Sequence, residues 1–276
     1  MCIRDSAQRV KDADAIIVVG GISARLEGEQ MPVSLDGFNG GDRTRIELPD
    51  VQKELLAAMH KTGKPVILVN CSGSAIGFGD VETQYNALLQ AWYGGQAAGL
   101  AVADVLFGDY NPAGRLPVTF YKSTDQLPDF ENYDMEGRTY RYFRGEPLYA
   151  FGYGLSYTTF EYGNATLSRN SIKAGKGVKV SIPVTNSGKY DGDEVVQVYV
   201  KSLDNPDAPI KSLKGFKRVN IAAGTTATVT IELDSKAFEF YDESADELAP
   251  RAGKYQILYG SSSKGSDLKA LDFEVI

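Results

Sequence analysis

The stretch that decides the fold lies at residues 92–117, with WYGGQAAG at 92–99 and GDYNPAGRLP at 108–117. A pair of glycines follows a predicted strand, an apolar helical run comes next, and a turn rich in Asn, Pro and Gly closes the stretch. Glycines at such a turn let a helix pack closely on a sheet. The stretch therefore indicates a strand–helix unit of an α/β domain.

Short apolar runs alternate with helical periodicity up to about residue 120. The runs at 15–19, 65–69 and 87–92 predict strands that are buried on both faces, as in a parallel sheet covered by helices. Helices are predicted over 51–60 and 96–107. In the second helix, the residues expected to face inward are Leu100, Ala103, Val105 and Leu106. This order of elements predicts an open α/β sheet.

From about residue 160 the apolar residues recur at every second position. The alternation is clearest at 178–185, 196–201, 229–233, 255–259 and 271–275, and turn residues separate these segments. Several half-buried strands at this spacing predict an antiparallel, immunoglobulin-like sandwich.

These patterns predict three parts of the chain. An α/β domain occupies 7–120, an aromatic-rich linker occupies 121–159 and an all-β domain occupies 160–276. The linker is expected to pack along both domains rather than to move freely, because its rings would otherwise lie in water. Those rings are Tyr133, Tyr140, Tyr142, Phe143, Tyr149, Phe151, Tyr153 and Tyr157.

Composition excludes several classes of function. The net charge of −7 argues against nucleic acid as a partner, because a phosphate backbone would be repelled. With one histidine, His60, the chain cannot form a zinc site built on several imidazoles. Two cysteines, Cys2 and Cys71, cannot form a disulfide framework. Neither a metal ion nor a cofactor is expected.

No membrane span is expected. The longest apolar stretch, 97–107, is too short to cross a bilayer and contains Asp104. No signal peptide is visible at the start, and residues 1–6 are expected to be an artefact of a truncated reading frame.

The loop at residues 25–43 follows the first predicted strand, at the sheet edge where α/β folds bind ligands. Its acidic residues are compatible with two interpretations, a functional loop or a solvated acidic surface. A calcium loop is a further reading, although 36–42 lacks alternating oxygen donors and the closing Glu. A phosphate cradle at 94–99 is disfavoured, since Gly94, Gly95 and Gly99 do not have dinucleotide spacing.

Five short motifs together resemble the family 3 glycoside hydrolases, the family of β-glucosidases and β-xylosidases. They occur in the family's order over nearly the whole chain: EGE at 27–29, GDR at 41–43, WYGG at 92–95, NPAGRLP at 111–117 and FGYGLSY at 151–157. GRTYRY at 137–142 resembles the β-xylosidase branch.

The resemblance implies an N-terminal (β/α)8 barrel with an Asp nucleophile, an α/β sandwich domain that supplies the acid/base, and a fibronectin type III-like domain. This chain resembles the last two, so the barrel and its nucleophile are expected to be absent from it. Glu29 matches the family's general acid/base, and Glu27 is the second choice. Family members are often secreted or periplasmic, which is the localisation that the resemblance implies.

The function expected from this resemblance is that of the C-terminal fragment of a retaining β-glycosidase, most closely a xylan 1,4-β-xylosidase acting on xylo-oligosaccharides together with its N-terminal barrel. A β-glucosidase and a bifunctional α-L-arabinofuranosidase are alternatives. From other classes come a nucleotide-binding flavodoxin-like protein and a non-catalytic carbohydrate-binding or structural module. The exposed aromatics that a binding module would need on the sandwich are Tyr199, Tyr241 and Tyr259.

Overall fold

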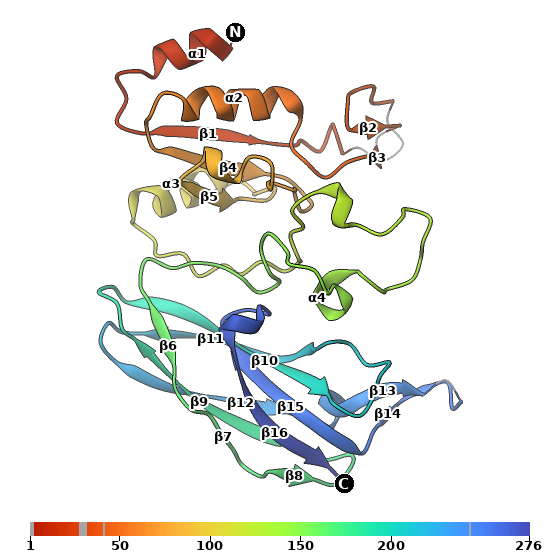
Figure 1. Ribbon diagram of the computed structural model, residues 1–276. Helices are drawn as coiled ribbons and strands as arrows, with labels where there is room; N and C mark the ends of the chain where they lie inside the picture. The colour runs from red at the N-terminus through yellow and green to blue at the C-terminus, as the bar shows by residue number, and fades with distance from the viewer. Residues whose placement is uncertain (1–2, 28–31, 41, 243) are drawn as a thin grey trace. The chain divides into compact units, whose positions relative to one another are not determined.

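The computed structural model describes residues 3–27, 32–40, 42–242 and 244–276 (Figure 1). They form two compact units. Unit 1 comprises Met1–Phe107, Phe120–Tyr133 and Gly145–Tyr149, and unit 2 comprises Gly108–Thr119, Asp134–Arg144 and Ala150–Ile276. The segment predicted as a linker therefore contributes residues to each unit, while the boundaries predicted at 120 and 160 stay predictions.

Unit 1 contains a parallel sheet of three strands in the order β1-β4-β5. The strands are β1 (Ile16–Gly21), β4 (Val66–Cys71) and β5 (Ala87–Gln90). The helices of unit 1 are α1 (Ile3–Arg9), α2 (Asp50–His60) and α3 (Ala98–Phe107). Helix α2 lies along β1 in Figure 1. The predicted α/β sheet is confirmed, with each predicted strand and helix present.

Burial differs between the central and the outer strand. In β4, Val66, Leu68 and Val69 are at most 1% exposed, as expected for a strand covered on both faces. In β1, Ile17 and Val19 are 47% and 69% exposed, so the prediction of burial on both faces is wrong for this strand. The reason is its edge position, where α2 covers one face and no described element covers Ile17 and Val19 on the other.

Helix α3 also departs from its prediction. Leu100 is 66% exposed, so the predicted inward stripe is wrong for Leu100, whereas Ala103, Val105 and Leu106 are half-buried. The sequence of α3, AGLAVADVLF, is apolar on every side except at Asp104. Periodicity therefore could not select one face of this helix.

Short elements complete unit 1: the strands β2 (Phe38–Asn39) and β3 (Asp42–Arg43) and the 3-10 helices η1 (Glu82–Gln84) and η2 (Thr124–Gln126). The Glu47 carboxylate accepts hydrogen bonds from the Thr124 backbone N at 2.7 Å and from Thr124 Oγ1 at 2.8 Å. These contacts attach the segment that begins at Phe120 to the rest of unit 1.

Unit 2 is a sandwich of two sheets, with orders β11-β10-β15-β16-β8 and β12-β9-β6, and β7 also pairs with β9. The strands are β6 (Phe160–Tyr162), β7 (Thr166–Leu167), β8 (Ser171–Ile172), β9 (Val178–Asn186), β10 (Gly192–Ser202), β11 (Ser212–Ile221), β12 (Thr226–Leu233), β15 (Gly253–Gly260) and β16 (Leu268–Val275). The hairpin β13 (Glu239–Asp242) and β14 (Glu247–Pro250), helix α4 (Thr139–Tyr142), η3 (Ser235–Phe238) and η4 (Gly265–Asp267) also belong to it.

The core of the sandwich lies between the two sheets. Val180 and Ile182 of β9 and Val196 and Val198 of β10 are fully buried, at 0% exposure. Ser181, which lies between Val180 and Ile182 in β9, faces outward, as the alternating pattern predicted. The predicted immunoglobulin-like sandwich is confirmed.

The two densest motifs of the sequence contact each other within unit 2. Asn111 Oδ1 accepts hydrogen bonds from Ser156 Oγ and the Tyr157 backbone N, both at 2.8 Å. The Leu116 backbone N donates to the Tyr153 carbonyl at 2.9 Å. NPAGRLP at 111–117 and FGYGLSY at 151–157 are therefore joined by hydrogen bonds into one substructure, which we call the clasp.

A buried ion pair joins this clasp to strand β10. Arg115 Nη2 lies 2.6 Å from Glu194 Oε2, with the two side chains 8% and 1% exposed, and Tyr162 OH donates to the other Glu194 oxygen at 2.6 Å. A Cβ at Gly154 would lie 2.2 Å from the Gly114 carbonyl oxygen, so only glycine allows this approach. The prediction that Arg115 anchors the turn electrostatically is confirmed.

The aromatic residues of 121–159 are covered unevenly. Tyr140 of α4 stacks on Phe151 with ring centroids 4.2 Å apart and meets Tyr199 edge-on at 5.9 Å. Tyr133, in contrast, is 94% exposed, so the expectation that these rings are covered is wrong for Tyr133. A ring is covered only where a neighbouring element supplies apolar atoms, and sequence composition does not report that.

Candidate active site

The candidate site lies at the carboxyl edge of the parallel sheet of unit 1. Strands β1 and β4 end at Gly21 and Cys71, and the segments that follow them meet at Glu27 on one side and at residues 72–74 on the other. In open α/β sheets, ligands bind at this edge because the loops there are free to vary. The predicted position of the loop after β1 agrees with this geometry.

Both carboxylate oxygens of Glu27 accept hydrogen bonds. Oε1 accepts from Ser74 Oγ at 2.6 Å, and Oε2 accepts from the Gly73 backbone N at 3.3 Å. The Tyr93 hydroxyl donates to Oε2 as well. With three donors on two oxygens, Glu27 fastens the loop after β1 to the loop after β4 and to the segment after β5.

Arg43 supports the same network from β3. Its Nη1 donates to Ser74 Oγ at 2.9 Å and to the Ala75 carbonyl at 3.1 Å, and its Nη2 donates to the Ile46 carbonyl at 2.5 Å. Burial lowers the pKa of Arg43, while the Glu27 charge opposes that shift. Ser74 Oγ therefore accepts a hydrogen bond from Arg43 and donates one to Glu27, which fixes the rotamer of Ser74.

A second set of polar side chains lies beneath this network. Asn70 Nδ2 donates to Ser72 Oγ at 2.9 Å and to Gln90 Oε1 at 2.6 Å. Ser72 Oγ donates to the Ser74 carbonyl at 2.8 Å. Asn70 and Ser72 are fully buried, so the turn that carries Gly73 and Ser74 is held from below.

Gly73 is required by close packing. A Cβ at this position would lie 2.8 Å from Tyr93 Cε2 and 3.0 Å from Glu27 Oε2. Any larger residue would displace one of these two side chains. The glycine thus permits the Tyr93 hydroxyl and the Glu27 carboxylate to meet.

Burial, followed by the hydrogen bond to Glu27, raises the pKa of Tyr93 to about 12. The neutral hydroxyl is therefore favoured in the folded chain, where it can donate to the carboxylate. Tyr93 belongs to the WYGG motif, whose expected role was packing of a helix on a sheet. In the structure its tyrosine also positions Glu27.

Of the two predicted catalytic residues, the structure describes only Glu27. Glu27 lies in the network just described, whereas Glu29 lies outside the described residues. Sequence analysis did not identify Gly73, Ser74 or Tyr93 as partners of Glu27. The signal for the first two was the small polar run that follows β4 directly, since such residues at a carboxyl edge indicate a site.

Among residues 3–27, 32–40, 42–242 and 244–276, no group of three or more His, Cys, Asp or Glu side chains is arranged to hold a metal ion. In the same part of the chain, every helix is too short or too polar to cross a bilayer.

Replacing Tyr93 with Phe should lower the free energy of unfolding of unit 1 by about 1 kcal/mol, because a hydrogen bond to a carboxylate is lost at a half-exposed position. The stabilisation is present below pH ~10 and lost as the pH rises to about 12, because the folded-state pKa is raised to about 12. Denaturant unfolding followed by Trp92 fluorescence measures both effects.

Tyr133→Phe, at a ring that is 94% exposed, is the matched control and should change neither the free energy of unfolding nor its pH dependence. Equal losses in the two variants would contradict the anchoring role.

Two curated relatives cover nearly all of this chain. A xylan 1,4-β-xylosidase from Xylanibacter ruminicola is 52% identical over 97% of the chain, and a periplasmic β-glucosidase from Salmonella typhimurium is 35% identical over 99% of it. The chain spans only 31% and 36% of the length of these relatives. It therefore corresponds to about a third of such a protein.

Solved structures agree with the fold. The chain superposes on a β-glucosidase from Erythrobacter marinus with a TM-score of 0.86 at 33% identity, covering 99% of this chain and 36% of that one. A model of the fibronectin type III-like domain matches residues 194–263. A model of the glycosyl hydrolase family 3 C-terminal domain matches residues 2–157, which is more than half of the chain. The chain therefore belongs to glycosyl hydrolase family 3, as a C-terminal α/β domain followed by a fibronectin type III-like domain.

Proposed function

We propose that this chain is the C-terminal part of a retaining β-glycosidase that removes terminal β-linked xylose from xylo-oligosaccharides. The similarity to the xylan 1,4-β-xylosidase carries the choice of sugar, because that relative is 52% identical and the β-glucosidase is 35% identical. The carboxyl-edge network supplies the structural support, because it fixes the start of the loop that carries Glu29.

Glu29 is the proposed general acid/base. In a retaining reaction, one carboxylate attacks the anomeric carbon while a carboxylic acid about 5–5.5 Å away protonates the leaving oxygen. The resulting carboxylate then removes a proton from the water that hydrolyses the glycosyl-enzyme intermediate. Glu29 follows Glu27 by two residues, so an anchored Glu27 restricts the reach of the proposed acid.

Glu27 is proposed to position the loop rather than to transfer protons. Its oxygens already accept hydrogen bonds from Ser74, Gly73 and Tyr93. A general acid needs its proton directed at the leaving group of the substrate. An acid engaged by three protein donors lacks that freedom, which favours Glu29.

The nucleophile is proposed to come from an N-terminal barrel domain of the longer protein. Relatives are about three times as long as this chain, which leaves room for such a domain. By the same comparison we propose a secreted or periplasmic location, since one relative is named a periplasmic β-glucosidase.

Two measurements test this function. The longer protein should cleave 4-nitrophenyl β-D-xyloside with a kcat/KM about tenfold or more above that for the β-D-glucoside, because the extra hydroxymethyl group of glucose must be accommodated. The 276-residue chain alone should hydrolyse neither. Preference for the glucoside would replace xylosidase with glucosidase, and turnover by the chain alone would contradict the proposed division of catalytic groups.

A further inference from the structure

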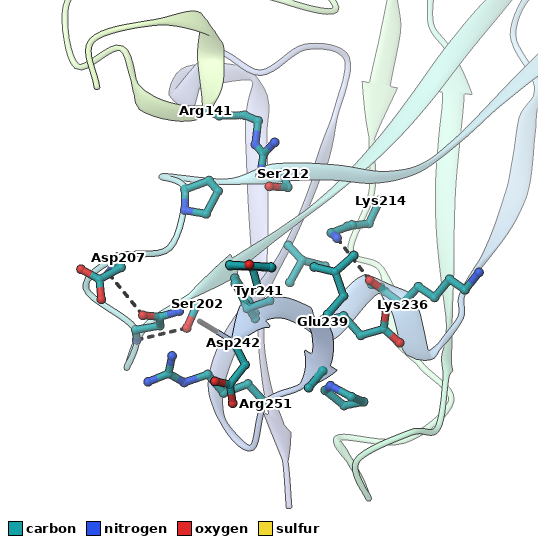
Figure 2. Close-up of a pocket in the computed structure, with 18 of the residues that line it drawn as sticks. Arg141, Ser202, Asp207, Ser212, Lys214, Lys236, Glu239, Tyr241, Asp242 and Arg251 are labelled. Atoms are coloured by element: carbon teal, nitrogen blue, oxygen red, sulfur yellow. Dashed lines mark hydrogen bonds between the residues drawn. The ribbon is translucent and has the colours of Figure 1, made fainter. Parts of the chain in front are cut away.

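A large pocket lies in unit 2. It has a volume of about 940 Å³ and is bounded by α4, by the connection between β10 and β11, and by the β13–β14 hairpin. Ligand sites in proteins commonly measure about 300–1,000 Å³, so the pocket can hold a small ligand. Figure 2 shows Tyr241 among the lining residues, with Arg141 and Ser212 above it and Asp242 and Arg251 below it.

The hairpin presents an exposed apolar surface to this pocket. Tyr241 and Leu248 lie opposite each other in the β13–β14 register and are 58% and 64% exposed. The Tyr241 hydroxyl donates to Asp246, which fixes the outer end of the ring. An aromatic ring held in place beside an aliphatic side chain is a surface on which the C–H face of a sugar ring can pack.

Polar groups of both kinds surround this ring. The side chains of Arg141, Lys214 and Arg251 are donors, and those of Asp207, Glu239 and Asp242 are acceptors. None of these side chains takes part in an ion pair among the residues that the structure describes. Their charges are nearly balanced, so the pocket does not favour a highly charged ligand.

Lys214 is one of the cations that line the pocket. Its Nζ donates to the Lys236 carbonyl at 3.2 Å, which leaves two of its three protons for other acceptors. Burial and then the nearby Arg141 charge lower the pKa of Lys214, while Glu239 partly offsets this. A neutral ligand with many hydroxyl groups can accept from such a lysine without bringing a charge of its own.

We propose that this pocket binds an uncharged oligosaccharide, as a chain end or a short soluble segment, separately from hydrolysis. Each sugar hydroxyl both donates and accepts, which matches a lining that has cations and carboxylates around one aromatic ring. Tyr199, Tyr241 and Tyr259 do not form the flat aromatic row expected of a polymer-binding surface, because Tyr199 and Tyr259 are buried at 0% and 2% exposure. Only the choice of xylose as the sugar rests on the proposed function.

Titration calorimetry of the 276-residue chain with xylotetraose tests this proposal, and we expect saturable binding. Tyr241→Ala should weaken binding about tenfold or more, since the stacking surface is removed. Tyr190→Ala, at a ring that is 62% exposed elsewhere on the sandwich, is the matched control and should leave binding unchanged. Asp207→Asn, which keeps the ring, should also weaken binding, and circular dichroism verifies that each variant is folded.

Absence of saturable binding to both xylotetraose and cellotetraose would overturn the proposal. Equal affinity in Tyr241→Ala and the wild type would also overturn it, as would binding of tetragalacturonate alone, because the pocket would then be an anion site. Binding of cellotetraose but not xylotetraose would support the pocket and contradict the choice of xylose. Since no turnover is measured, failure of the pocket is distinguishable from failure of the proposed hydrolysis.

Discussion

Replacing Glu29 with Ala in the longer protein should slow hydrolysis of xylobiose by about 10²–10⁴-fold, because a xylose leaving group needs protonation by a general acid. 2,4-Dinitrophenyl β-xyloside, whose leaving group departs without a proton, should lose far less in its first step. Steady-state and burst kinetics on the two substrates separate these effects. Azide should partly restore turnover of 2,4-dinitrophenyl β-xyloside, because it attacks the glycosyl-enzyme intermediate in place of water. The product is then a xylosyl azide.

Glu27→Gln is the informative comparison for this experiment. Glutamine keeps the size of the side chain but weakens the hydrogen bonds from Ser74 and Tyr93. We expect similar losses on both substrates, with no rescue by azide, because positioning affects every substrate. If Glu27→Gln, or the shorter Glu27→Ala made beside it, instead shows the leaving-group dependence and the rescue, the acid/base assignment moves to Glu27.

Arg115→Met should lower the free energy of unfolding of unit 2 by about 3–5 kcal/mol, because it leaves the Glu194 carboxylate buried without its cation. The pair is 2.6 Å apart, and its side chains are 8% and 1% exposed, so water cannot replace the lost partner. Tyr162 still donates to Glu194 but carries no charge. Guanidinium unfolding followed by circular dichroism measures the loss.

A surface pair between β10 and β11, in which Asp193 is the neighbour of Glu194 on β10, provides the control. Arg218 Nη2 lies 2.5 Å from Asp193 Oδ2, with Arg218 54% exposed, and Arg218→Met should cost only about 0–1 kcal/mol. The double variant Arg115→Met/Glu194→Leu should recover most of the loss, since it removes both buried charges. Equal losses for the two arginines would show that burial does not decide the strength of the first pair.

Much of the fold was predictable from local patterns. Continuous apolar runs predicted β1, β4 and β5, and strict alternation predicted β9 and β10. These patterns succeed because a strand's side chains alternate between two faces. They failed for α3, where nearly every side is apolar and no period can select the buried face.

The candidate site was predictable only in part. The loop after β1 and the residues Glu27 and Glu29 followed from their position and from the family resemblance. The partners of Glu27 did not, because Ser74 and Tyr93 are 47 and 66 residues away in the sequence. A contact over such a separation depends on how β1, β4 and β5 are ordered in the sheet.

The motif-rich stretch at 92–117 shows which features the sequence determines and which the tertiary structure decides. By itself, the sequence determined the strand–helix unit, the turn chemistry and the family, because these depend on residues that are near neighbours. Tertiary structure alone decided that Tyr93 supports Glu27 and that Arg115 is neutralised by a buried Glu194. The physical reason is that hydrogen bonds and ion pairs depend on distance in space, which the fold sets.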